Sequence, residues 1–301
     1  MKSCTIVAAL AIASGLAVAG PFDEYNLIVR NDLNLSTSEV DGSAIIGGSL
    51  LGGTSNYTTM GVTASNGDGL AIGNTLASGV TVNINNAGNF RIGSLANQLG
   101  TVNLNGGGSL VADPLVSSRA ASYVSQASAI SAHLSTLATN GTIDVAGNMT
   151  AATTVLDGMN VAVYTLSQAQ FDTLGQLSLN FGTADSVIIN FVHDGSGVVD
   201  LSAPPNIIGG FNQANSPRIL WNFADATQIT VNNSFNGALF APLAQLNVTG
   251  GGINGTVVVD SINLQNAEIR LGTYQGYLPT PGAGALLAAA GLLASRRRRA
   301  A

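Results

Sequence analysis

The chain has 301 residues, of which 9% are charged and 5% aromatic, with 37 glycines and a formal net charge of −6. A soluble domain commonly has about a quarter charged residues, so Asn, Ser, Thr and Gln must cover this surface instead. These numbers exclude a basic nucleic-acid binder. The 46% of hydrophobic residues can form a core and exclude a disordered chain.

The N-terminus has the pattern of a secretory signal peptide. A basic start precedes an apolar run from Cys4 to Val18, and the small residues Ala17 and Ala19 suit a signal peptidase. We expect residues 1–19 to be removed on export. Cys4 is the only cysteine, so the exported chain would have neither a disulfide nor a reactive thiolate.

From Tyr25 onward, the chain consists of short alternating runs interrupted by glycine and asparagine. Such runs start at Ser43 (SAIIGGSLLGG), Gly69 (GLAIGNTLASG), Val80 (VTVNINNAGNFRIGSL) and Thr101 (TVNLNGGGSLVADP). Alternation with a period of two predicts half-buried strands, here about every 10 to 15 residues. The pattern predicts an irregular β-solenoid of right or left hand, with a β-sandwich as the alternative.

Two segments have helical patterns instead. Asp113 and Pro114 are suited to start a helix, and apolar residues recur at three- and four-residue steps until Asn140 and Gly141. We expect an amphipathic helix of about 24 residues that packs along the solenoid. A shorter helix is predicted from Ser167 to Leu174, where Ser167 and Gln170 have capping-box spacing. The later runs, from LSLNFG onward, are strand-like.

Particular motifs resemble the choice-of-anchor A domain family. They are W-N-F-x-D-A at Trp221 to Ala226, G-x-x-x-A-P at Gly237 to Pro242 and G-x-I-N-G-x-V from Gly252, together with the N-terminal steps S-x-V-x-G and G-G-x-L. The resemblance covers residues 22–277. It implies a secreted or surface-displayed adhesive module, similar in outline to ice-binding proteins of the strand-plus-long-helix type, and it implies no catalytic residues.

The C-terminal segment, residues 278–301, has three parts in the order of a sorting signal. A motif with Pro279, Thr280 and Pro281 precedes an apolar run of about 13 residues, shorter than a stable membrane span. A basic cluster ends it: Arg296, Arg297, Arg298 and Arg299. It resembles a PEP-CTERM tail handled by exosortases, which implies a transient inner-membrane anchor. An ordinary C-terminal membrane anchor is the alternative.

Without these ends, the charge is strongly negative. Five arginines stand against 16 acidic residues, which gives a net charge of −11 and no lysine. An acidic surface repels phosphates and anionic headgroups, so we expect no nucleic-acid partner. The expected partners are signal peptidase, an exosortase-like enzyme and an extracellular ligand such as a surface glycan or matrix.

Candidates for chemistry are few. His193, Asp194 and Ser196 in HDGSG lack the glycine spacing of a nucleophile elbow, and we interpret them as a turn. Asn66, Gly67 and Asp68 lack the remaining ligands of a calcium loop. We therefore expect no enzyme, cofactor or metal site.

A polar face is the remaining candidate site. The alternating polar positions of two strand runs are Thr81, Asn83, Asn85, Thr101, Asn103 and Asn105. Rows of Thr and Asn can match polysaccharide hydroxyls or ordered water, although solvent-facing strand positions need no ligand. The sequence favours an exported bacterial surface or extracellular-matrix protein with an adhesive, structural role. The alternative is a binding module for ice or polysaccharide.

Overall fold

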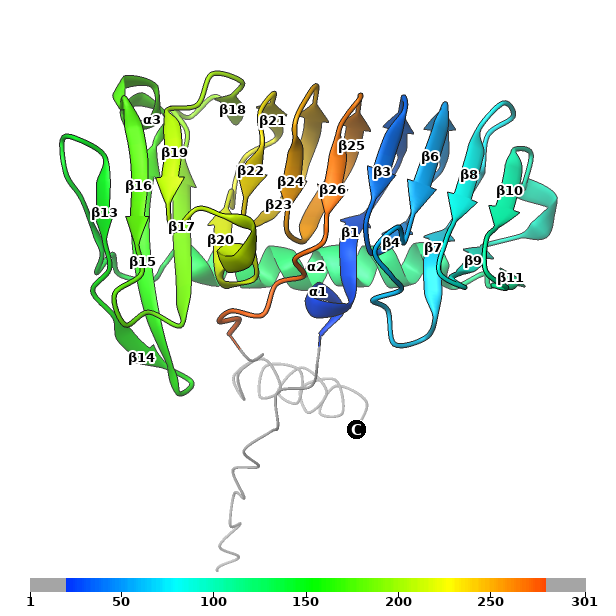
Figure 1. The fold of residues 1–301 in the computed structure, drawn as a ribbon, viewed down its shortest axis with the longest axis horizontal. Coiled ribbons are helices and arrows are strands. Elements are labelled where there is room, and N and C mark those ends of the chain that lie inside the picture. The colour runs from blue at the N-terminus through cyan, green and yellow to red at the C-terminus, as the bar shows by residue number, and fades with distance from the viewer. Residues whose placement is uncertain (1–19, 280–301) are drawn as a thin grey trace, which may run out of the picture.

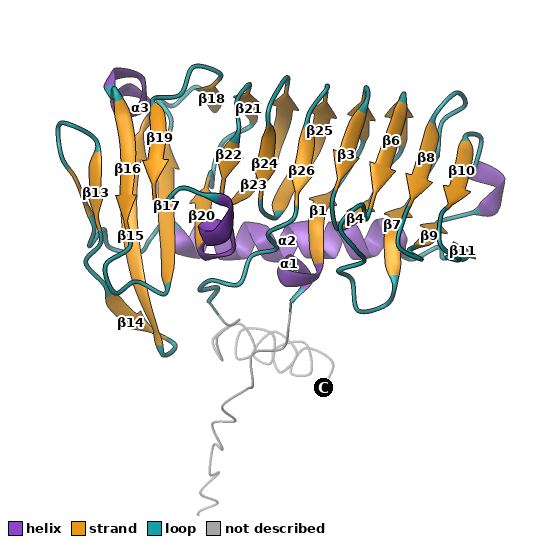
Figure 2. Ribbon diagram, viewed as in Figure 1, coloured by secondary structure: helices purple, strands orange, loops and turns teal. Residues whose placement is uncertain are grey.

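The strands turn at glycine corners and stack in parallel into a three-sided β-solenoid (Figure 1). This computed structural model describes residues 20–279. The predicted signal peptide and the part of the predicted sorting tail from Thr280 lie outside the described residues. Figure 2 shows the strands side by side along the long axis, with one long helix beside them.

The helix side is the longest row of strands. In spatial order it contains β11 (Leu110–Ala112), β9 (Asn89–Ile92), β7 (Asp68–Ile72), β4 (Ser43–Ile46), β1 (Tyr25–Val29), β25 (Val257–Leu264), β23 (Ala238–Val248), β20 (Ile219–Asn222), β17 (Ser186–Val192), β15 (Met159–Ser167) and β14 (Thr154–Leu156).

The front sheet has seven strands: β10 (Thr101–Leu104), β8 (Thr81–Ile84), β6 (Thr54–Tyr57), β3 (Ser38–Val40), β26 (Glu268–Arg270), β24 (Gly252–Asn254) and β22 (Phe235–Asn236). Beyond it, at the left in Figure 1, lie β19 (Asn206–Gly209), β16 (Gln176–Asn180), β13 (Asn148–Thr150) and β12 (Thr142–Ile143).

The back face is built from β5 (Leu50–Gly52), β2 (Leu33–Leu35), the second halves of β25 and β23, β21 (Gln228–Val231) and β18 (Val198–Leu201). The register shift in β23 between Ala241 and Gln245 marks where that strand passes from the helix side to the back face.

The chain starts and ends in the middle of the solenoid. Strands β1 to β11 proceed from the middle to one end, α2 (Val116–Leu134) returns along the length, and β12 to β26 fill the other half (Figure 1). There β25 pairs with β1 and β2, and β26 pairs with β3. The two halves are thus joined by parallel pairing between residues more than 200 positions apart.

The strand pairing excludes the β-sandwich alternative. Among the described strands, all pairs are parallel except β12 with β13 and β14 with β15. Sandwich sheets are antiparallel, whereas a chain that coils repeatedly in one direction must pair its strands in parallel. The predicted β-solenoid is therefore confirmed.

Stacked glycines allow close packing at one corner. Gly47, Gly73 and Gly93 occupy equivalent positions in successive coils, and their N–H groups donate to the carbonyls of Val29, Ile46 and Ile72. A Cβ atom at Gly73 would lie 2.2 Å from the carbonyl oxygen of Gly47. Only glycine fits at this corner, because the neighbouring coil's backbone occupies the space of a side chain.

The predicted long helix forms, but it is shorter than the sequence predicts. It spans 19 residues and buries Val116, Ala120, Val124, Ala127 and Leu134 against the helix side. The pattern of apolar residues continues past Leu134 because Leu137, in the turn that follows the helix, still packs against the same hydrophobic cluster. Asp113 is not the N-cap: Leu115 directly precedes the helix, and the Asp113 carboxylate accepts its N–H.

The remaining helices are short. They are α1 (Pro21–Glu24), α3 (Gln168–Thr173) and the 3₁₀ turns η1 (Leu95–Asn97) and η2 (Gln213–Arg218). The capping box predicted for α3 is confirmed, with Ser167 and Gln170 bonded reciprocally. Within residues 20–279, no helix combines the length and the apolar character that a membrane crossing requires.

Candidate ligand-binding face

The predicted polar positions lie on two adjacent strands of the front sheet. Thr101 stands opposite Thr81, and Asn103 opposite Asn83, in the parallel pair of β10 and β8. Asn85 and Asn105 follow the ends of these strands. The intervening residues Val82 and Ile84 are fully buried, so the alternation predicted from sequence holds.

A third strand, which sequence reasoning missed, extends these rows. Thr54 stands opposite Thr81 and Asn56 opposite Asn83, because β6 pairs in register with β8. The sequence signal for this strand was weak because the inward position between Thr54 and Asn56 is Ser55. This serine is buried, and the equivalent residue on β8 is Val82. We call the eight residues the Asn–Thr array: Thr54, Thr81, Thr101, Asn56, Asn83, Asn103, Asn85 and Asn105.

Side-chain hydrogen bonds connect the array. Asn103 Nδ2 donates to Asn83 Oδ1 at 2.8 Å, and Asn83 Nδ2 donates to Asn56 Oδ1 at 3.0 Å. Asn105 Nδ2 donates to Asn85 Oδ1 at 3.1 Å. Each asparagine amide has two donor and two acceptor sites, and each of these bonds uses one donor site of one side chain and one acceptor site of the next. The array is thus ordered before a ligand binds and keeps free hydrogen-bonding capacity.

A shallow hollow continues the front sheet beside the array. It has a volume of about 280 Å³ and is lined in part by Thr37, Glu39, Asn56 and Glu268. Glu39 and Glu268 stand opposite each other in the pair of β3 and β26, and Arg270 Nε contacts Glu268 Oε2 at 2.7 Å. The front sheet therefore changes from uncharged to acidic at this junction.

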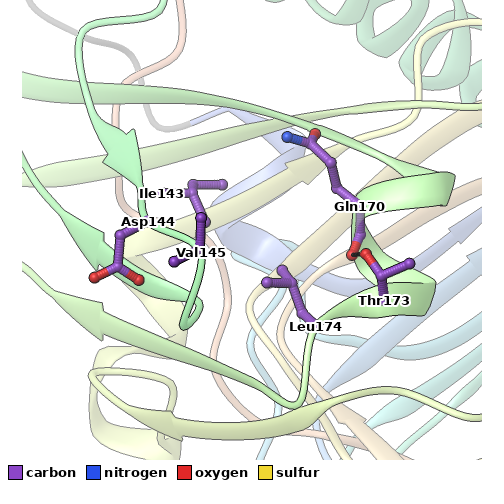
Figure 3. Close-up of a pocket in the computed structure, with 6 residues that line it drawn as sticks. All are labelled: Ile143, Asp144, Val145, Gln170, Thr173 and Leu174. Atoms are coloured by element: carbon purple, nitrogen blue, oxygen red, sulfur yellow. Dashed lines mark hydrogen bonds between the residues drawn. The ribbon is translucent and has the colours of Figure 1, made fainter.

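A second hollow lies near the other end, between α3 and the β12–β13 turn (Figure 3). Its volume is about 330 Å³ and Ile143, Val145 and Leu174 supply its apolar lining. Asp144 there accepts hydrogen bonds from the Asn148 side chain and backbone, and these hold the pKa of Asp144 below its usual value. Its carboxylate therefore stabilises its own turn.

The back face carries a row that the sequence analysis did not single out. Pairing places six positions in register across β18, β21, β23, β25, β2 and β5: Asp200, Thr230, Asn247, Asn263, Asn34 and Leu51. Asn263 Nδ2 donates to Asn247 Oδ1 at 2.8 Å. This row mixes a carboxylate, amides and a leucine, so it is chemically less uniform than the Asn–Thr array.

The HDGSG segment forms the predicted turn. His193 Nδ1 accepts the N–H groups of Gly195 and Gly197, at 2.8 and 3.2 Å. The Asp194 carboxylate accepts the N–H of Ser196, and the Ser196 hydroxyl accepts that of Val198. Each of these side chains thus binds the backbone of its own turn, and Ser196 has no contact with the imidazole that could activate it.

The Asn66-Gly67-Asp68 segment is not a cation loop. Asp68 is buried, and its carboxylate receives Arg91 Nε at 2.8 Å and Asn66 Nδ2 at 2.9 Å. Across residues 20–279, no three His, Cys, Asp or Glu side chains gather in a way that could hold a metal ion.

Comparison with solved structures finds ice-binding proteins. Those of the ascomycete Antarctomyces psychrotrophicus, an Arctic yeast and Shewanella frigidimarina are 13%, 15% and 13% identical to this chain. They cover 84%, 87% and 85% of this chain, and 96%, 95% and 98% of their own chains, with TM-scores of 0.37, 0.32 and 0.32. Because these scores are low, the fold assignment rests on the strand pairing described above.

Comparison with curated proteins gives no match. A family model matches residues 18–271, a range that contains almost all of the described solenoid, including the Asn–Thr array and the long helix. This chain therefore belongs to the family described as "Putative Ice-binding-like adhesive domain".

Proposed function

We propose that this protein is an exported, non-enzymatic adhesive module of a bacterial surface or extracellular matrix, and that its Asn–Thr array binds an extended polysaccharide. The observation that carries the proposal is the register of β6, β8 and β10, which places like residues side by side on one sheet. A polymer with repeated hydroxyl groups needs such repeated, uncharged donors and acceptors.

The energetics of the array suit such a ligand. Its amides are held by hydrogen bonds of 2.8 to 3.1 Å, so binding has little side-chain entropy to remove. The array has no charge whose desolvation would oppose contact with a neutral sugar. We therefore expect binding that depends little on salt, unlike binding driven by the acidic residues elsewhere.

A binding experiment with matched variants tests the proposal. The full chain would be sedimented with insoluble cellulose and chitin, and screened on a glycan array. The double variant Asn83→Leu and Asn103→Leu should bind at least tenfold more weakly, whereas Asn148→Leu, an exposed asparagine on β13, should bind as the wild type does. Equal loss in both variants, or no binding to any glycan, would contradict the proposal.

Export and anchoring are the second part of the proposal, and their support is the sequence. Residues 1–19 would direct export by signal peptidase. The tail from residue 278 would be sorted by an exosortase-like enzyme after a transient stay in the inner membrane, consistent with the choice-of-anchor A resemblance. Mass spectrometry of the mature ends would detect both cleavages. Replacing Pro279, Thr280 and Pro281 by alanine should leave the protein unprocessed in the membrane fraction.

Ice is the second candidate ligand, favoured by the row of Thr54, Thr81 and Thr101 in register across three strands. Such a row offers a methyl and a hydroxyl group at the strand spacing of about 4.8 Å. Inhibition of ice recrystallisation by the full chain, lost in Thr81→Leu, would select ice over a glycan.

A further inference from the structure

The end of the solenoid at β10 and β11 has unpaired strand edges. We call residues 95–112 the open end. Among the described strands, β10 pairs only with β8, and β11 only with β9. The N–H groups of Thr101 and Asn105 donate to the carbonyls of Val80 and Ile84, so the alternate residues Val102 and Leu104 direct their main-chain groups away from the solenoid.

The hydrophobic core is also uncovered at this end. Val82 and Ile84 on β8 are fully buried, whereas their register partners Val102 and Leu104 on β10 are only half-buried. Around them Leu99 is 61% and Leu110 is 44% exposed. Apolar side chains and free backbone groups therefore meet in one terminal surface.

This edge has no protection against strand pairing. Residues 95–112 contain no Lys, Arg, Asp, Glu or Pro, although natural edge strands usually carry a charge, a proline or a bulge. The first acid that follows, Asp113, contacts Arg91 at 3.4 Å and Arg119 at 2.8 Å. The open end is thus electrically neutral on a strongly acidic body.

The opposite end is closed differently. There β12 and β14 turn back as antiparallel partners of β13 and β15. The exposed carboxylates Asp144 and Asp157 lie in the turns of this end. An apolar surface placed against it would have to desolvate these charges.

We propose that two copies of this chain join through their open ends, with β10 of each copy pairing antiparallel to the other. The second copy is the favoured occupant because it offers an identical edge, with the same free main-chain groups on β10 and no charged residue between 95 and 112. Elsewhere the two bodies, each with five arginines against 16 acids, repel each other, so this neutral end is where they can approach. Head-to-tail contact is disfavoured by the carboxylates of the other end. A two-fold contact is closed, so assembly stops at the dimer.

The dimer would enlarge the polar front surface. Antiparallel pairing of β10 within one sheet keeps both front sheets on the same side, so the two Asn–Thr arrays become one continuous surface. A polymer that touches both arrays gains avidity through the high effective concentration of the second site. The self-association itself does not depend on any ligand.

Disulfide crosslinking tests the proposal on the full chain. With Cys4 replaced by serine, the chain has no cysteine, and Thr101→Cys, Asn103→Cys and Asn105→Cys each place one thiol along the proposed contact. Directly opposed residues have Cα atoms about 4.5–5.5 Å apart, within the range that a disulfide spans. Thr150→Cys, exposed on β13 at the other end, is the matched control.

We expect a crosslinked dimer in at least one of the three test variants and in none of the control. Adding Leu99→Lys and Leu110→Lys should reduce the crosslinked fraction at least tenfold, with an unchanged circular dichroism spectrum and melting temperature. Equal crosslinking of the control, or crosslinks to other proteins instead of a second copy, would overturn the proposal. So would the absence of any crosslink at a protein concentration of about 1 mM, which is the effective concentration of modules that are held close together.

Discussion

Of the places where asparagines stand in register in this solenoid, one is buried on the helix side and another lies on the surface of the front sheet. On the helix side, Asn190 and Asn222 lie opposite each other on β17 and β20, at 6% and 1% exposure. On the front sheet, Asn83 and Asn103 lie opposite each other on β8 and β10. The inter-side-chain bonds are alike, 2.8 Å in both pairs.

What differs is the partner of the remaining polar atoms. Asn222 contacts the Ser131 hydroxyl through Oδ1 and donates to the Ser131 carbonyl, and Asn190 donates to the carbonyl of Leu134. These bonds fasten the C-terminal end of α2 to the strands. On the front sheet, the remaining atoms face solvent. The same spacing therefore stabilises the fold where it is buried and leaves groups free for a ligand where it is exposed.

The largest expected effect is in the buried pair. Asn222→Ala removes one side chain of a closed network and leaves Ser131 and Asn190 with unsatisfied groups, so the free energy of unfolding should fall by about 3 kcal/mol. Denaturant titration followed by circular dichroism measures this loss. A loss below about 1 kcal/mol would show that α2 is held by apolar packing alone.

An intermediate effect is expected at the other end of α2, where charges replace amides. The Leu115 N–H and Arg119 hold the pKa of Asp113 below its ordinary value of 3.8. A lowered folded pKa gives stability that is present above pH 3.8 and lost as the pH falls through the folded pKa. Asp113→Asn removes the ion pairs with Arg91 and Arg119 and should cost up to about 1 kcal/mol at pH 7.

The control for that prediction is the shape of the pH profile. Thermal melts from pH 7 to pH 2 should show a smaller acid-induced loss in Asp113→Asn than in the wild type, because the variant has already lost the titrating carboxylate. Asn222→Ala should shift the whole curve without changing its slope, since no amide titrates in this range. Parallel curves for Asp113→Asn and the wild type would refute the ionic fastening.

The smallest effect on stability is expected in the exposed ladder. Asn83→Ala removes two solvent-accessible hydrogen bonds, to Asn56 and Asn103, so the free energy of unfolding should change by about 0.5 kcal/mol or less. The same denaturant titration checks this value. A loss comparable with that of Asn222→Ala would mean that the Asn–Thr array is a structural element rather than a surface kept for binding.

Sequence reasoning recovered the alternating strands and the long helix, because period and glycine spacing are local properties. It missed Thr54 and Asn56 since Ser55 occupies their inward position, and it extended α2 too far because Leu137 packs from a turn. The pattern of apolar residues also gave no role to Ser131, which is buried on α2 and contacts Asn222. In each case the deciding partner comes from another coil.

The sequence by itself determined that this chain forms short strands with polar, nearly uncharged outer faces, because composition and alternation require no knowledge of neighbours. Only the tertiary structure decided which strands are adjacent. The pairing of β1 with β25, the third strand of the Asn–Thr array and the unpaired edge of β10 all depend on register between distant segments. Register is set when one face of every strand must be buried at once, a condition that the whole solenoid imposes.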